Sequence, residues 1–325
     1  MIGGSHLVYR TAMLRPDLPP AATPPVLPPS SVLPGGGADN LRGSLLMMLS
    51  TAAFICNDTV MKAVTQSLPL YQAIALRGGV VLLLLVFLAR AQGGVRLRVP
   101  RGDMAPLILR TAADVASTVL YLLALRQMAL ADISAIMQAL PLAITLAAAL
   151  FFRERLGWRR MLAITIGFCG VLLILRPGTG AFDLWSGVAL VAMLLIVLRD
   201  MTTRLFSVGV GSSTVAFHAA LAVALSGLLL SAGESWRFPT TGEFALLVLA
   251  ALFLSVGYIT AVATMRVGEI SFVAPFRYSS LVWAVLLGLT VFGEWPDIWT
   301  WAGSALVVGA GIYTILREGK LQGRD

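Results

Sequence analysis

The residue best placed to do chemistry in an unusual environment is Arg277, which lies within a long run of apolar residues. At the centre of a membrane-spanning helix an arginine costs about 2.5–3.5 kcal/mol on insertion scales, so it should face a cavity or a partner. Its planar fork of donors suits a carboxylate or a phosphate. Pro275, two positions earlier, removes a backbone donor and can open a helix beside a site. We therefore expect Arg277 either to bind an anionic substrate group or to hold the helices together through an internal ion pair.

Arg77 and His218 are placed similarly within other apolar runs. Arg77 supports the same two interpretations as Arg277, and the Gly78-Gly79 pair after it would allow close helix approach. His218 falls within one position of Arg77 when the two halves of the chain are aligned. A histidine at that depth either relays a proton or donates a hydrogen bond to another helix.

Two acid–base pairs share one spacing. Asp58 precedes Lys62 by four residues and Asp200 precedes Arg204 by four, so each pair lies on one face of a helix. In a protein whose halves face opposite ways, the pairs would lie at opposite mouths of a central pathway and act as alternating gates. The other interpretation is a static salt bridge at each mouth, worth about 0–1 kcal/mol.

Further polar or aromatic residues lie within apolar runs and could line an amphipathic pocket. They are Tyr121, Tyr258, Tyr278, Trp283, Gln138 and Asn57. Because only a few polar groups set the specificity of a site, some of these side chains are expected to bind substrate and others to pack between helices.

The composition indicates that all these residues lie in a membrane protein. The 325 residues are 58% hydrophobic and 12% charged, with a mean hydropathy of +0.87. A water-soluble domain has about 25% charged residues, so too little polar surface is present here to coat a soluble globule. Two cysteines and two histidines give no disulfide framework and no metal-ligand spacing, and we expect no cofactor.

Ten apolar segments of about 20 residues follow a proline-rich tail over residues 1–40, which we expect to be disordered. A short cytoplasmic tail over 318–325 closes the chain. The expected spans are approximately 44–64, 69–90, 105–126, 131–151, 158–176, 184–206, 213–232, 243–265, 270–292 and 298–316.

The distribution of basic residues predicts the orientation. Sixteen of the 24 Lys and Arg residues fall on the side of the N-terminus, four on the opposite side and four within spans. Because basic loops stay in the cytoplasm, both termini are predicted to be cytoplasmic.

The chain also resembles itself. Residues in the first half match residues 137 to 142 positions later: Tyr121 with Tyr258, Asp132 with Glu269, Ser134 with Ser271, Asp58 with Asp200, Lys62 with Arg204, Glu154 with Glu294 and Trp158 with Trp299. A repeat of five helices, an odd number, is necessarily inverted in the membrane. The expected fold class is therefore an all-α integral membrane protein with ten transmembrane helices as two inverted five-helix repeats.

The ten spans, the APFRYSSLVWAVLLG segment ending in Phe292-Gly293-Glu294 and its counterpart ending in Phe152-Arg153-Glu154 resemble the EamA type of the drug/metabolite transporter superfamily. The ninth span is similar to that of members called S-adenosylmethionine uptake proteins. This resemblance implies two EamA domains, at 44–177 and 184–317, which together carry small metabolites across the inner membrane.

Our functional hypothesis is thus an inner-membrane secondary transporter of an amino acid, a nucleoside-like solute or an S-adenosylmethionine-like solute. No ATP-binding loop, protease motif or nucleic-acid-binding patch is found, so gradients or exchange would supply the energy. The alternatives are an intramembrane enzyme acting on a lipid-linked substrate and a non-transporting scaffold. We expect the lipid bilayer and a small molecule as partners, no nucleic acid, and either a monomer or a homodimer.

Overall fold

The fold is all-helical in the part of the chain that the structure describes. This computed structural model describes residues 37–91, 99–152, 157–176, 184–207, 210–264, 267 and 270–322. The predicted tail up to residue 36 lies outside these ranges, as do Glu154 and Glu269 of the predicted repeat. Ten helical stretches among the described residues are long and apolar enough to cross a membrane, so the protein is a multi-pass membrane protein and the predicted all-α membrane class is confirmed.

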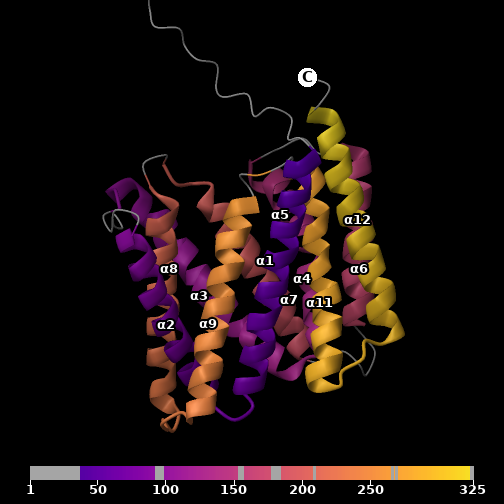
Figure 1. The fold of residues 1–325 in the computed structure, drawn as a ribbon. Helices are drawn as coiled ribbons and strands as arrows, with labels where there is room; N and C mark the ends of the chain where they lie inside the picture. Colours follow the sequence, from indigo (N-terminus) through magenta and orange to yellow (C-terminus); the bar gives the residue numbers. More distant parts are fainter. Residues whose placement is uncertain are drawn as a thin grey trace, which may run out of the picture. The chain divides into compact units, whose positions relative to one another are not determined.

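Figure 1 shows the long helices running side by side. In chain order the elements are α1 (Gly37–Val64), α2 (Leu70–Ala91), η1 (Arg101–Asp103), α3 (Met104–Gln127), α4 (Leu130–Met137), α5 (Leu140–Phe152), α6 (Trp158–Leu175), α7 (Leu184–Thr203), α8 (Ser212–Leu230), η2 (Ser231–Gly233), α9 (Thr241–Thr264), α10 (Ile270–Val273), η3 (Ala274–Tyr278), α11 (Ser279–Leu287), η4 (Gly288–Phe292) and α12 (Ile298–Gln322).

The first and last helices are longer than the sequence predicts. Helix α1 includes residues 37–40 of the predicted tail, and Asp39 in its first turn is favourable beside the positive end of the helix dipole. Helix α12 continues to Gln322 instead of ending near residue 316. Apolar length alone does not mark these ends, because a helix can extend past the hydrocarbon layer into the polar interface.

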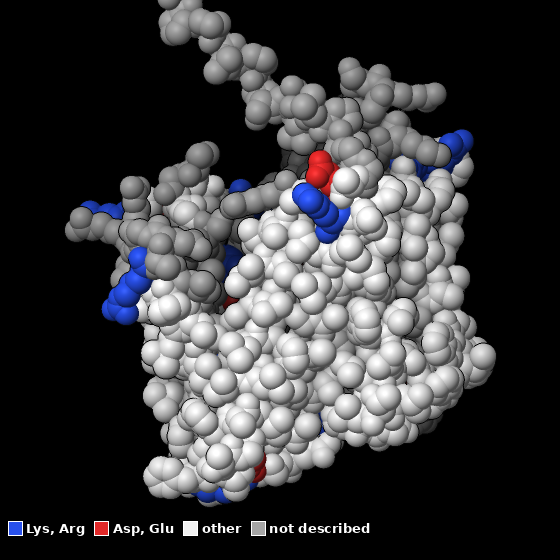
Figure 2. All heavy atoms as spheres, viewed as in Figure 1, with Lys and Arg blue, Asp and Glu red and all other residues white. Residues whose placement is uncertain are grey.

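Charged groups gather at the two ends of the visible face, and the band between them is almost free of charge (Figure 2). Large apolar side chains such as Leu83, Phe87 and Leu229 are each more than 70% exposed. A surface of this kind requires lipid rather than water around it.

The four most extensive helix contacts join the first half of the chain to the second: α1 with α9, α3 with α7, α2 with α8, and α6 with α12. The last pair is close because Gly170 and Gly303 face each other. A Cβ atom on Gly303 would lie 2.5 Å from the carbonyl oxygen of Gly170. Without a hydrophobic driving force between helices in lipid, close backbone approach of this kind supports packing.

These pairings have a regular pattern. Each helix can be replaced by the helix at the corresponding place in the other half of the chain, five spans away. This replacement turns the α1–α9 pair into the α7–α3 pair and the reverse, and it leaves the α2–α8 and α6–α12 pairs unchanged. Two related halves would produce that pattern. The inverted repeat itself stays a prediction.

Two expected spans are interrupted instead of continuous. The fourth divides into α4 and α5 around Gln138, and Pro141 at the start of α5 lacks the N–H that would continue the helix. The ninth divides into α10, η3, α11 and the π-helical turn η4, with Pro275 in η3. The interruptions lie at corresponding places in the two halves, which is where transporters with internal repeats build their sites.

Helix α9 begins with a capping box. The backbone N–H of Glu243 donates to the Thr240 hydroxyl oxygen at 3.2 Å, and a Glu243 carboxylate oxygen accepts from the Thr240 N–H at 2.8 Å. Outside the span, Arg237 donates two hydrogen bonds to the same carboxylate. The pKa of Arg237 is raised by this contact, so the guanidinium stays charged at every physiological pH.

Candidate functional site

The first polar cluster within the spans joins α1, α2 and α3 in a hydrogen-bonded chain. Arg77 donates through Nη1 to the Asn57 amide oxygen at 3.2 Å, and Asn57 donates to Asp58 Oδ1 at 2.9 Å. The Tyr121 hydroxyl donates to Asp58 Oδ2 at 2.7 Å. Two neutral donors thus satisfy the carboxylate, while the amide lies between it and the guanidinium. We call these four residues the Asp58 cluster.

Arg77 is left partly unsatisfied by this arrangement. Arg77 is only 6% exposed. Even so, it forms no ion pair with a carboxylate among the described residues, and its Nε has no hydrogen-bond partner. A buried charge normally has a counter-charge, because isolated ions are costly to desolvate. The unpartnered Nε of Arg77 therefore requires an explanation.

The second polar cluster joins α3 to α7. Arg199 donates through Nη1 to Asp114 at 3.0 Å and through Nε to Asp200 at 2.9 Å. Nearby, Arg110 donates through Nε to the Thr203 hydroxyl at 3.0 Å, while its buried Nη1 has no partner. We call Arg199, Asp114 and Asp200 the Arg199 cluster. Its guanidinium is well paired, so it has a structural role between helices.

Tyr258 connects the two clusters in space. Its phenol lies within electrostatic range of Arg77 in the first cluster, of Arg199 and Asp114 in the second, and of Arg110. The residue is nevertheless 56% exposed. We call the region around Tyr258, among the charges that α2, α3 and α7 contribute, the hollow.

Arg277 approaches the same region from η3. It is exposed, and it lies within electrostatic range of Asp200 and Arg199 of α7 but forms no ion pair in the described part of the chain. The nearby Asp200 carboxylate lowers the cost of a mid-membrane guanidinium. Of the residues proposed from sequence, the structure thus places Arg77 and Tyr121 in the Asp58 cluster. Arg277 lies near the Arg199 cluster, and Tyr258 lies within electrostatic range of both clusters.

Gln138 connects the two interrupted spans. Its amide nitrogen donates to the Ser280 hydroxyl at 2.6 Å and to the backbone oxygen of Tyr278 at 3.3 Å. The backbone oxygen of Tyr278 lies where irregular helix geometry frees acceptors. Gln138 is 4% exposed, so its role in this structure is to join the two breaks.

Three other predicted site residues point elsewhere. The Tyr278 ring is buried against Gly311 of α12, and Trp283 packs against the hydrophobic core. His218 bonds through Nδ1 to the Thr214 carbonyl of its own helix at 2.8 Å. None of these three contacts brings the side chain into either cluster.

The predicted i, i+4 pairs are not the contacts that form at the mouths. Lys62 instead donates to Glu294 at 2.5 Å and to the Met128 carbonyl at 2.7 Å, and it lies over the Phe292 ring at 4.8 Å. Asp58 is already held by neutral donors in its own cluster. The long side chain of Lys62 reaches the C-terminal end of α3, where the Met128 carbonyl needs a hydrogen-bond donor.

A related contact lies at the opposite mouth. Asp200 pairs with Arg199 rather than with Arg204, whose guanidinium lies 5.7 Å from the centre of the Phe152 ring. In the alignment of the halves, Arg204 corresponds to Lys62 and Phe152 to Phe292. The cation and the ring thus recur as a pair at both ends of the bundle.

Residues 41–176 match the EamA-like transporter family. This stretch of the chain is similar to EamA-like transporters. This agrees with the resemblance seen in the sequence, and named relatives across the drug/metabolite transporter superfamily support it.

Several relatives carry transporter names. An S-adenosylmethionine uptake transporter of Rickettsia felis is 25% identical over 57% of this chain and 63% of its own length. A riboflavin transporter of Vibrio cholerae is 30% identical over 54% of this chain and 58% of its own. A pseudopaline exporter of Pseudomonas aeruginosa is 24% identical over 82% and 94% respectively. The match thus spans about three fifths of the length of the first relative.

The fold also matches the crystal structure of another protein, whose description gives no function. The TM-score is 0.60 and the identity 20%, covering 86% of this chain and 98% of the other. At that identity the match concerns the arrangement of helices alone.

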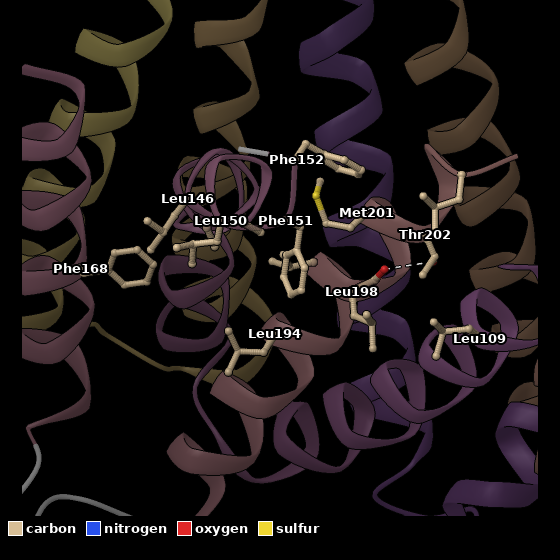
Figure 3. A pocket seen from close by; sticks show the side chains of 14 residues that line it. Leu109, Leu146, Leu150, Phe151, Phe152, Phe168, Leu194, Leu198, Met201 and Thr202 are labelled. Atoms are coloured by element: carbon tan, nitrogen blue, oxygen red, sulfur yellow. Dashed lines mark hydrogen bonds between the residues drawn. The ribbon is translucent and has the colours of Figure 1, made fainter. Parts of the chain in front are cut away.

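An apolar pocket of 540 Å³ lies between α3, α5, α6 and α7, partly within the EamA-like domain. Figure 3 shows Phe151, Leu194 and Leu198 turned toward it. Its lining consists of hydrophobic side chains and the Thr202 residue. Such a lining provides no counter-charge, so this pocket does not suit a charged solute.

Sequence reasoning did not propose Arg199, Asp114 or Arg110 as part of the site. Each is a charged residue within an expected span, which is a functional signal by itself. Arg110 and Arg199 entered only the count of basic residues. The pairing of Asp114 with a residue 85 positions away follows from the contact between α3 and α7, which sequence spacing does not reveal.

Proposed function

We propose that this protein is a secondary transporter that carries a small metabolite across the inner membrane by alternating access. The observation that carries the proposal is the set of charged side chains from both halves of the chain, on α2, α3 and α7, that lie within electrostatic range of Tyr258 inside the membrane spans. A buried polar space of this kind is expensive to maintain in a membrane, and solute pathways are its commonest use.

The proposed architecture is two inverted EamA domains, at 44–177 and 184–317, with both termini in the cytoplasm. The exchange pattern of helix pairs and the matched interruptions in the fourth and ninth spans support it. Inverted halves of this kind move against each other around a site near the middle of the membrane.

The proposed gates are the two cation–ring contacts. Lys62 with Phe292 and Glu294 would close one mouth, and Arg204 with Phe152 would close the other. These contacts replace the Asp58–Lys62 and Asp200–Arg204 pairs as the groups that open and close. Since the residues correspond in the two halves, opening one mouth while the other stays closed would need only a rearrangement of the halves.

The names of the relatives support a small organic solute without agreeing on one. They specify S-adenosylmethionine, riboflavin and pseudopaline. We propose a metabolite of comparable size, in the range from amino acids to nucleoside-like and S-adenosylmethionine-like compounds. Its energy would come from exchange or from an ion gradient, because no ATP-binding loop is found in the sequence.

Exchange in proteoliposomes tests this function. The purified protein is reconstituted into vesicles that contain an unlabelled mixture of amino acids, carboxylates, nucleosides and S-adenosylmethionine. Uptake of each labelled solute into these vesicles is then followed. We expect saturable uptake of at least one solute, and its loss in Tyr258→Ala, which alters the hollow without removing a charge. Protein-containing vesicles that take up every solute no faster than empty vesicles would contradict the proposal.

A further inference from the structure

The charged residues around the hollow fall into two groups that differ in how well they are paired. Arg199 contacts two carboxylates, Asp114 and Asp200. Arg77 contacts one amide oxygen and no carboxylate of the described chain, although it is the more deeply buried of the two arginines. Asp58 is a counter-charge within electrostatic range of Arg77, but its oxygens accept from Asn57 and Tyr121. An external anion would give Arg77 the direct contact with a negative group that Asp58 does not provide.

Hydrogen-bonding capacity leads to the same conclusion. A guanidinium has five N–H donors in a fixed plane. One donor of Arg77 is engaged by Asn57, and its buried Nε has no partner. The neighbouring carboxylate, on Asp58, is directed to Asn57 and Tyr121 instead. A carboxylate ligand accepts two parallel bonds from a guanidinium edge, and one such edge of Arg77 contains the unpartnered Nε.

The charge balance of the hollow adds an independent argument. Four arginines contribute to it, namely Arg77, Arg110, Arg199 and Arg277, against three aspartates, namely Asp58, Asp114 and Asp200. With all carboxylates ionised, these described residues leave one positive charge in excess. A solute of net charge −1 would neutralise the space, whereas a net cation would double the excess.

We infer that the hollow binds a carboxylate solute of net negative charge, with Arg77 as the group that holds its carboxylate. This inference rests on the proposed transport function and narrows its substrate class. Arg277, which like Arg110 forms no ion pair with a described residue, borders the space from the second half of the chain and takes the remaining negative charge of the solute. Compounds of net positive charge, such as S-adenosylmethionine with its sulfonium and ammonium groups, are disfavoured.

Binding to the purified protein in detergent tests this without requiring transport. Thermal unfolding is measured with succinate, glutamate, methionine and S-adenosylmethionine, which run from net charge −2 to +1 at neutral pH. We expect the midpoint to rise with the net anions and not with S-adenosylmethionine. An equal or larger rise with the cation, or none with any anion in a panel of di- and tricarboxylates, would overturn the inference.

Three variants assign the effect to Arg77. Arg77→Gln should weaken anion binding about 30-fold or more, the change expected when one partner of a desolvated charge contact is removed. Arg77→Lys keeps the charge but not the fork and should lie in between. Arg317→Gln removes a charge from α12, where the guanidinium contacts Tyr313, and should bind anions as the wild type does. Equal weakening by Arg317→Gln would mean that only the overall charge matters, and the inference would fail.

Failure of this inference and failure of the transport proposal have different signatures. If proteoliposomes exchange neutral or cationic solutes and no anion, transport stands and the anion assignment is wrong. If anions raise the unfolding midpoint but no solute is exchanged, the binding assignment stands and the transport function is wrong. Should Arg77→Gln not fold, the wild-type ranking of anions against cations still decides the charge class.

Discussion

The contact between Lys62 and Glu294 provides the sharpest test of the proposed gates. The Lys62 side chain is 5% exposed and that of Glu294 is 26% exposed, so water screens the pair only weakly. Breaking a fully buried pair from one side costs about 3–5 kcal/mol, whereas an exposed pair is worth at most about 1 kcal/mol. For this intermediate burial we expect Glu294→Gln to weaken closure of the mouth by about 2 kcal/mol.

Hydrogen exchange measures this change directly. The backbone N–H of Leu130 donates to Glu294 at 2.9 Å and is protected only while the mouth is closed. A loss of 2 kcal/mol corresponds to roughly 30-fold faster exchange of this amide, because 1.4 kcal/mol is a factor of ten in an equilibrium constant. Mass spectrometry of the peptide spanning residues 128–132 reports that amide.

Asp297→Asn is the matched control. Asp297 pairs with Arg176 at the same end of the bundle, but its side chain is 46% exposed. This substitution should leave exchange at Leu130 unchanged. Exchange at Leu130 that is as slow in Glu294→Gln as in the wild type would refute the assignment of this contact as a closed gate. Equal acceleration by both variants would show that any charge change at this end loosens it.

Three further predictions concern the packing that supports the site. Gly303→Ala should lower the free energy of unfolding by about 1–3 kcal/mol, because the new Cβ would lie 2.5 Å from the Gly170 carbonyl oxygen. Gly309→Ala on the same helix should be neutral, because its Cβ would have no neighbour within 4 Å. Thermal unfolding in detergent measures both. Arg199→Gln leaves carboxylates unpaired and should cost about 3 kcal/mol, partly restored by adding Asp114→Asn; no restoration would argue against the ion pair. Thr240→Ala removes a cap of α9 and should cost about 1 kcal/mol, with faster amide exchange confined to the first turn of that helix.

The spans were predictable because bilayer thickness fixes their length and composition. Ten apolar runs were expected, and ten helical spans are found among the described residues. Pro275 was noted as a residue that can open its helix, although 270–292 was expected to be one span. Pro141 lacks an N–H in the same way, and no break was expected there.

The contacts at the site were less predictable. Arg77, Arg277, Tyr121 and Tyr258 were identified because polar residues in a membrane are costly. Their partners were not, since the nearest acid in the sequence is not the nearest in space. Lys62 shows the difference, because its carboxylate partner lies 232 residues away rather than four. Helix spacing defines a face, and tertiary packing decides what that face meets.

The amide of Gln138 has a mechanical consequence. It fastens α4–α5 to η3 and α11 at the two places where the spans lack regular helical bonding, so each bend is tied to the other. A neutral link of two hydrogen bonds is weak enough to exchange partners and directional enough to transmit a displacement. Any solute that shifts the η3 turn through Arg277 therefore also pulls on the opposite half of the molecule, with no need for a second binding event.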